Sequence, residues 1–128
     1  MELTSNALQT VPVNQSVYFT DAPINGNCSI IHREGSGLVT LKGITNQCRA
    51  RFRVSFGANI AVPTGETVGA VSLALAIEGE AIPATNMIVT PAAVEEFFNV
   101  YSSIFIDVPR DCCQTISVKN TSTIPVNV

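Results

Sequence analysis

The stretch Cys48-Arg49-Ala50-Arg51-Phe52-Arg53-Val54-Ser55-Phe56 alternates between two kinds of side chain. Successive side chains of a strand point to opposite sides, so an extended chain would separate them by face. One face would carry the apolar residues Ala50, Phe52, Val54 and Phe56, and the other would carry the arginines and Ser55. This alternation predicts a strand that buries one face in a core.

The three arginines on the opposite face are less ordinary. Guanidinium groups this close repel one another unless water or carboxylates separate them. One interpretation is a solvated face, and the other is a face that meets another subunit and pairs its arginines with acids. The residues alone leave both open.

Composition favours a single domain that self-associates. The 128 residues suffice for one domain with a real core. Hydrophobic residues make up 46% and charged residues only 13%, against a usual charged share of about 25%. So few charges leave apolar surface to be covered, which predicts an oligomer. The net charge of -3 and the pI near 4.9 argue against nucleic-acid binding.

No targeting or membrane segment is expected. No run approaches the ~18 apolar residues of a membrane span. The N-terminus has neither a basic start nor a continuous apolar core, so we expect no secretory signal peptide. A protein of this kind that acts outside the cell would leave it by lysis or assembly.

Apolar alternation along the chain predicts an all-β antiparallel sandwich of about eight short strands. Residues 1–15, with Pro12, are expected to form an N-terminal arm or edge strand, and residues 16–128 the domain. Asp21–Asn27 is expected to be a turn. Thr90–Phe97 fits a helix start but is expected to be a loop. The predicted strands are Ser16–Thr20, Ser29–His32, Leu38–Leu41, Cys48–Ala61, Val71–Glu78, Met87–Val89, Val100–Val108 and Thr115–Asn120, with Pro125–Val128 a strand just beginning.

The sandwich core should come from the apolar faces of the long strands. In Val71–Glu78, the face opposite the leucines carries only small neutral residues. The predicted core comprises Ala50, Phe52, Val54, Phe56, Leu73, Leu75, Ile77, Ile104 and Ile106.

We find no catalytic constellation in the sequence, and we expect neither an enzyme nor a metal or cofactor site. His32 is the only histidine, and Arg33-Glu34 beside it indicates a surface position. Gly35-Ser36-Gly37 leads into a strand, so it is expected to be a turn and not a phosphate loop. Glu78 and Glu80 are expected to be surface carboxylates, with calcium binding the weaker alternative.

The order of elements is similar to that of a known superfamily. A Gly35–Leu41 segment leads into a long strand with alternating aromatics, then come Ser72–Pro83 and two strands joined by a short loop. This order resembles the trimeric jelly-roll heads of the tumour-necrosis-factor and complement-globular-head superfamily. It is most similar to C-terminal domains of bacterial collagen-like spore-surface glycoproteins and to small proteins of clostridial phages. The resemblance covers Val17 to the C-terminus and implies a jelly-roll sandwich assembled as a homotrimer.

Two departures from that family matter. The sequence has no collagen-like stalk, so the N-terminal arm is expected to anchor the protein to a capsid or other particle surface. The relatives end on a complete hydrophobic strand, whereas this sequence stops at Val128. The last strand is therefore expected to be very short, or a partner covers its place.

The resemblance also implies a trimer interface. It makes the arginine-rich strand and Val100–Val108 antiparallel neighbours in the sheet that faces the threefold axis. Asp107 would then lie near Arg49 and offset charge, while aromatic and guanidinium groups stack. The implied interface residues are Arg49, Arg51, Arg53, Tyr101, Phe105 and Asp107.

The same pairing bears on the cysteines. It would bring Cys48 near Cys112 and Cys113, which predicts a disulfide from Cys48 to one of them. Cys28 is a further candidate and could link neighbouring subunits or stay free. Buried free thiols and a zinc site are the alternatives, although vicinal cysteines lack the usual zinc spacing.

Together these features predict a non-enzymatic homotrimer that decorates the surface of a phage virion. A spore-surface structural protein of similar fold is the first alternative. A carbohydrate-binding jelly roll is the second, for which the sequence offers Tyr18 and Tyr101 but no tryptophan.

Overall fold

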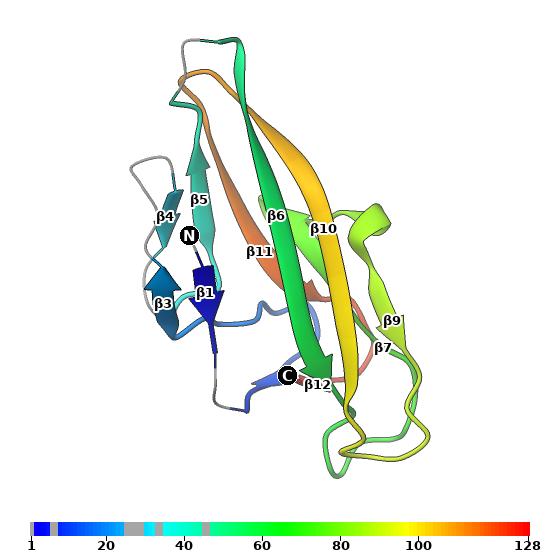
Figure 1. Cartoon of the computed structure of the whole chain (residues 1–128). Helices are drawn as coiled ribbons and strands as arrows, with labels where there is room; N and C mark the ends of the chain where they lie inside the picture. Colours follow the sequence, from blue (N-terminus) through cyan, green and yellow to red (C-terminus); the bar gives the residue numbers. More distant parts are fainter. Residues whose placement is uncertain (1, 6–7, 25–29, 33–34, 45–46) are drawn as a thin grey trace.

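The computed structural model describes residues 2–5, 8–24, 30–32, 35–44 and 47–128 (Figure 1). Their regular structure is antiparallel β apart from one short 3-10 turn, η1 (Pro83–Thr85). The strands are β1 (Glu2–Thr4), β2 (Thr10–Val11), β3 (Asp21–Ile24), β4 (Ile30–His32), β5 (Val39–Lys42), β6 (Arg49–Ile60), β7 (Val71–Ile77), β8 (Glu80–Ala81), β9 (Met87–Val89), β10 (Phe98–Pro109), β11 (Cys113–Asn120) and β12 (Val126–Asn127).

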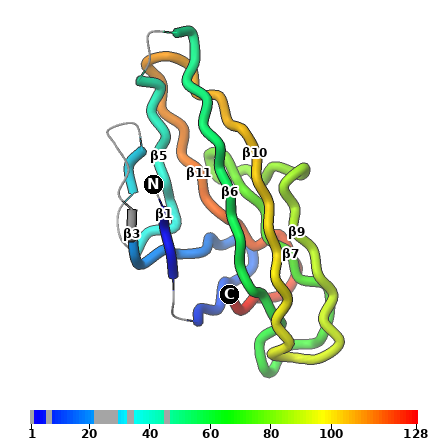
Figure 2. The backbone as a smooth tube through the Cα atoms, in the orientation of Figure 1, coloured from blue at the N-terminus to red at the C-terminus, as the bar shows by residue number. Residues whose placement is uncertain are grey.

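Two layers organise the molecule. One is a six-stranded sheet in the order β4-β5-β11-β7-β8, with β9 also paired to β7. The other is the long ribbon of β6 and β10, which crosses in front of that sheet (Figures 1 and 2). The all-β antiparallel architecture predicted from the sequence is therefore confirmed.

The ribbon has a regular register. β6 and β10 pair without a bulge from Arg49 opposite Pro109 to Ile60 opposite Phe98. Even-numbered side chains of both strands face the six-stranded sheet, and odd-numbered ones face away from it. This division of faces is the one that the alternation of residues 48–56 predicts.

The core lies between the layers, as expected. Phe56, Leu73, Leu75 and Ile106 are buried. Five other predicted core residues are only half-buried: Ala50, Phe52, Val54, Ile77 and Ile104. Four of these five, all but Ala50, pack against two buried clusters. The core is therefore less closed around Phe52 and Val54 than around Phe56.

The short strands near both ends differ from the expected pattern. Asp21–Ile24 was expected to be a turn, but it forms β3 and pairs with β1; residues 25–27 of that turn lie outside the described residues. Ser16–Thr20 was expected to be a strand, but it makes only a single bridge, from Ser16 to Lys119. The side chain of Gln9 explains this, because it hydrogen-bonds the N–H and C=O of Tyr18 at 3.0 and 2.9 Å and replaces a strand partner there.

The last strand is short. β12 pairs with β2, and its Asn127 also bridges to Ala61 just beyond β6. Residues 90–97 contain no helix, as predicted, and Glu95 there has a positive φ of 57°. Among the described residues, no helix is long and apolar enough to cross a membrane.

Candidate interaction site

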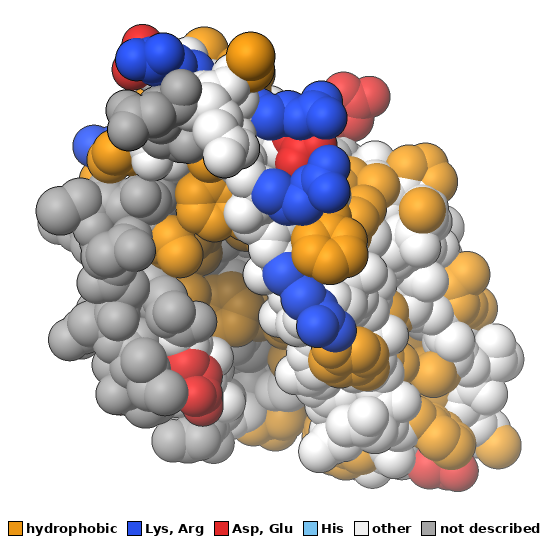
Figure 3. Space-filling model, turned by 45° about the horizontal axis from the view of Figure 1, so that its top comes forward, with side chains coloured by type: hydrophobic (Ala, Val, Ile, Leu, Met, Phe, Trp, Pro, Cys, Tyr) orange, Lys and Arg blue, Asp and Glu red, His pale blue; other side chains and the backbone are white. Residues whose placement is uncertain are grey.

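The outward side of the β6–β10 ribbon carries the predicted interface residues. Odd-numbered residues of both strands share it because neither strand contains a bulge. Basic side chains line up along it beside apolar ones (Figure 3). We call this surface the arginine face, and it comprises Arg49, Arg51, Arg53, Ser55, Tyr101, Ser103, Phe105 and Asp107.

Asp107 is shared by two arginines. Arg51 donates from Nε to Oδ1 at 2.9 Å and from Nη2 to Oδ2 at 3.3 Å. Arg49 Nε lies 3.6 Å from Oδ2. The hydrogen bond from Arg51, helped by the charge of Arg49, lowers the pKa of Asp107, and the same hydrogen bond raises the pKa of Arg51. Two of the three arginines therefore have a carboxylate partner within the chain.

Arg53 has a different environment. Its Nε donates to Ser103 Oγ at 3.2 Å, and that hydroxyl lies 2.9 Å from Ser55 Oγ. Tyr101 is on the same face, and the hydroxyls of Ser55 and then Ser103 lower its pKa, with the positive charge of Arg53 adding to the effect. Among the described residues, Arg53 has no salt bridge to a carboxylate.

Two large aromatic side chains stand out from this face. Tyr101 is 61% exposed and Phe105 is 64% exposed. The guanidinium carbon of Arg51 lies 6.0 Å from the centre of the Phe105 ring, at the limit for a cation–π contact. Aromatic and arginine side chains are enriched in protein interfaces, so the arrangement is suited to a protein contact.

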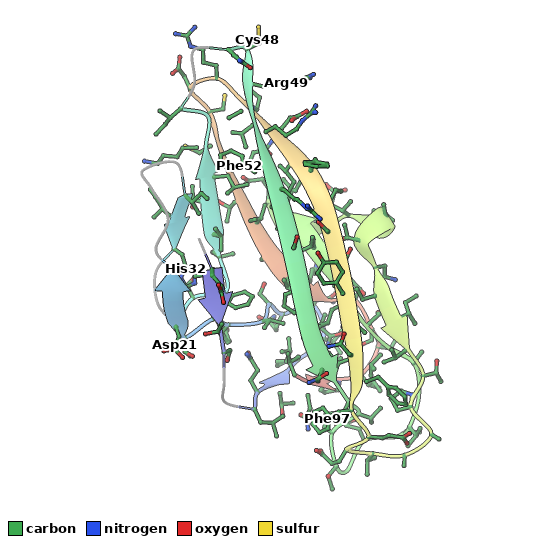
Figure 4. The ribbon with its side chains drawn as sticks, in the orientation of Figure 1. Asp21, His32, Cys48, Arg49, Phe52 and Phe97 are labelled. Carbon is green, nitrogen blue, oxygen red and sulfur yellow. The ribbon has the colours of Figure 1, made fainter. Side chains whose placement is uncertain are left out.

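The expected disulfide is not formed. Cys48, Cys112 and Cys113 are free and exposed, and Cys28 lies outside the described residues. The strand pairing itself holds, because the carbonyl of Cys48 accepts a hydrogen bond from the N–H of Arg110 at 3.0 Å. That pairing sets Cys48 beside Arg110 at the tip of the ribbon (Figure 4). Cys113 already belongs to β11, opposite Lys42 in the other sheet.

His32 is less exposed than a surface histidine would be. Its Nε2 lies 2.9 Å from the carbonyl oxygen of Ser36, and its ring packs edge-on against Phe19 at 6.3 Å between centroids. The neighbouring Arg33 and Glu34 lie outside the described residues. In the described part of the chain, no three His, Cys, Asp or Glu side chains gather as metal ligands would.

Glu78, one of the two carboxylates weighed as a calcium ligand, has a structural partner. Its Oε1 accepts a hydrogen bond from the backbone N–H of Thr115 at 2.7 Å, and this bond ties the turn after β7 to β11.

A groove between the layers was not expected from the sequence. It has a volume of about 760 Å³ and opens along the side of β6 away from β10. Figure 3 shows this hollow beside the ridge of blue side chains, with apolar residues inside it. We call it the inter-sheet groove; its lining includes Leu3, Leu8, Phe19, Val54, Leu75 and Val118.

Strand lengths in the structure account for the groove. β6 (Arg49–Ile60) is long, whereas β12 (Val126–Asn127) is short. In the structure β12 reaches only the end of the long strand, through the bridge from Asn127 to Ala61. The rest of that edge of β6 therefore borders the groove.

Comparison with protein-family models gives no match, and comparison with curated proteins gives none either. The arginine face and the inter-sheet groove are the two surface features that bear on function.

Proposed function

We propose that this protein is a non-enzymatic structural module that assembles as a homotrimer through the arginine face and is displayed on the surface of a particle. The observation that carries the proposal is the exposure of Tyr101 and Phe105, 61% and 64%, on the outward side of a two-stranded layer. Aromatic and arginine side chains are enriched at protein interfaces, so this exposure favours a protein contact.

The charges of the arginine face support a contact with copies of itself. Asp107 offsets much of the charge of Arg49 and Arg51 within each chain. Each chain then offers Arg53, with a serine for a partner, next to two exposed rings. In a symmetric assembly the guanidinium group of one chain can stack on an aromatic ring of the next.

The jelly-roll part of the proposal has its own support. The two layers pack face to face, and segments distant in sequence pair with one another, such as β5 with β11 in the larger sheet and β2 with β12 in a separate short sheet. The resemblance of the sequence to trimeric jelly-roll heads of spores and phages gives this arrangement a biological setting. We take the phage virion as the particle and the spore surface as the alternative.

The oligomeric state tests the interface. Light scattering coupled to size-exclusion chromatography should give a trimer at micromolar concentration. Phe105→Asp should give a monomer, because it places carboxylates in an apolar contact. Ile88→Asp is the matched control, since Ile88 is 61% exposed and lies on β9, outside the arginine face. A wild-type protein that stays monomeric, or a trimer unaffected by Phe105→Asp, would contradict the interface.

The particle is tested by mass spectrometry. Density-banded virions and purified spores of the same host would be digested and searched for peptides of this chain. Enrichment in virions, near stoichiometry with a capsid protein, is expected. Detection in spores alone would assign the protein to the spore coat, and absence from both would overturn the display function.

A further inference from the structure

β6 has a second edge whose backbone groups lack strand partners among the described residues. Pro109, which has no N–H, lies opposite Arg49, and the N–H and C=O of Ala61 bond to Asn127 at 3.0 and 2.9 Å. With no bulge between these points, the N–H and C=O groups of all odd-numbered residues of β6 point away from β10. In the described part of the chain, β6 forms its ladder with β10 alone. The free edge runs through Arg53, Ser55, Gly57 and Asn59.

This free edge borders the inter-sheet groove. The same residues, 53 to 59, line the groove, and the even-numbered side chains beside them turn toward its interior. The opposite layer contributes Leu75, Ile116 and Val118. Backbone groups that can form a ladder therefore stand beside a cavity that can take apolar side chains, which is the combination that strand addition requires.

We propose that the inter-sheet groove binds an extended strand of a partner protein, antiparallel to β6 and in line with β12. The bridge between Asn127 and Ala61 already starts such a third strand at one end of the groove. Residues 53 to 59 accommodate an incoming strand of about seven residues. Its alternate apolar side chains enter the groove, and its other side chains lie on the arginine face.

The charges select the kind of strand. An incoming side chain on the arginine face lies next to Arg53, which has a serine but no carboxylate partner among the described residues. An acidic residue at that position forms a cross-strand ion pair. The β6 edge of a second copy would instead bring its own row of arginines, and like charges across a ladder repel. The occupant is therefore an acidic partner strand and not another β6.

A small apolar molecule fits the site less well. It fills the cavity of about 760 Å³ but leaves the N–H and C=O groups of the β6 edge without partners. An incoming strand fills the cavity with its side chains and also pairs with these N–H and C=O groups. This inference does not depend on the trimer, because a single chain already presents both the free edge of β6 and Arg53.

A synthetic peptide tests the proposal directly. The probe is acetyl-Thr-Val-Thr-Val-Thr-Leu-Asp-amide, in which Val and Leu face the groove, Thr and Asp face outward, and Asp lies opposite Arg53. In an antiparallel pair with β6, the amides of the outward residues point to β6 and those of the inward residues point away. N-methylation of the outward residues should weaken binding at least tenfold in isothermal titration calorimetry. N-methylation of the inward residues is the matched control and should leave affinity within about threefold.

Variants of the protein provide a second test. Gly57→Pro removes an N–H on the groove side of β6 and should weaken peptide binding at least tenfold. Asn99→Pro removes an N–H on the outward edge of β10, outside the arginine face, and should leave peptide affinity within about threefold. Circular dichroism would check that both variants fold, and if either does not, the two methylated peptides decide the question with the wild-type chain.

Hydrogen exchange locates the strand. In the free protein the amides of Ser55 and Gly57 should exchange quickly and that of Phe56 slowly, and the peptide should protect the first two. No binding at millimolar peptide would overturn the proposal, as would equal affinity for both methylated peptides, which indicates apolar filling alone. Protection that rises with protein concentration without peptide would also overturn it, because a second copy then occupies the edge.

Discussion

At the scale of single residues, Asp107 controls the charge of the arginine face. Its carboxylate binds Arg51 at 2.9 Å and lies 3.6 Å from Arg49. The hydrogen bond from Arg51 lowers the pKa of Asp107 below its ordinary value of ~3.9. A depressed pKa in the folded state means that the contribution of this group is present above the ordinary value and lost as pH falls through the lowered one.

We therefore expect the ion pairs of Asp107 with Arg51 and Arg49 to persist from neutral pH down to about pH 4. They should break only in stronger acid. A carboxyl NMR titration of Asp107 should give a midpoint below that of an unpaired aspartate. Asp107→Asn should remove the acid-dependent step at the arginine face, with Asp111→Asn as the control, because Asp111 is exposed and its nearest cation is 3.9 Å away. A midpoint at or above the ordinary value would contradict the pairing.

Asn120 is a second residue that organises its surroundings, and no sequence pattern predicted this role. It is fully buried, and its Nδ2 donates to the carbonyls of Val11 at 2.9 Å and Ile124 at 3.1 Å. Its Oδ1 accepts from the backbone N–H and hydroxyl of Ser122. It thereby joins β11, β2 and the segment before β12.

Asn120→Ala should lower the free energy of unfolding by about 2–4 kcal/mol, because it leaves buried carbonyls without donors. Urea denaturation measures the loss. Asn99→Ala is the control, since Asn99 is exposed and bonds only to the side chain of Asn59 among the described residues. A loss below about 0.5 kcal/mol would mean that water replaces those bonds.

At the scale of elements, the alternation of residues 48–56 predicted both the strand and its buried face. Period-two alternation predicts strand faces well, because shifting the strand's pairing by one residue would expose every apolar side chain. The same reasoning failed for β3, where Asp21-Ala22-Pro23-Ile24 contains turn-forming residues but pairs with β1. A short edge strand tolerates Pro, so composition alone does not separate it from a turn.

Burial along β6 is graded, and this gives a prediction for the element. Phe56 is 8% exposed, while Phe52 is half-buried beside the inter-sheet groove. Phe56→Ala should cost about 3–5 kcal/mol of unfolding free energy. Phe52→Ala should cost clearly less, because part of that ring already contacts water. Equal losses in chemical denaturation would indicate that the groove closes over Phe52 in solution.

At the scale of the whole molecule, alternation along the sequence predicted the all-β class. The resemblance to jelly-roll heads implied the pairing of the two long strands and the face shared by Arg51, Arg53, Tyr101 and Phe105. Local alternation accounts for each strand and its faces, whereas the choice of neighbouring strand came from the order of elements in that family. The inter-sheet groove and the state of the cysteines depend instead on how far one strand extends along another. Cys48 lies opposite Arg110, which precedes Cys112 by two residues in the sequence.

The pairing of β2 with β12 has a consequence for synthesis. It joins Thr10 to Asn127, and Asn127 also ties to Ala61. Contacts between residues so distant in sequence close late and slow folding. A growing chain on the ribosome therefore carries Val11 without its native partner until residues 126 and 127 have emerged. During that interval the strand edges stay exposed unless a chaperone covers them. Nascent chains stalled before Val126 should therefore be more sensitive to protease than released chains.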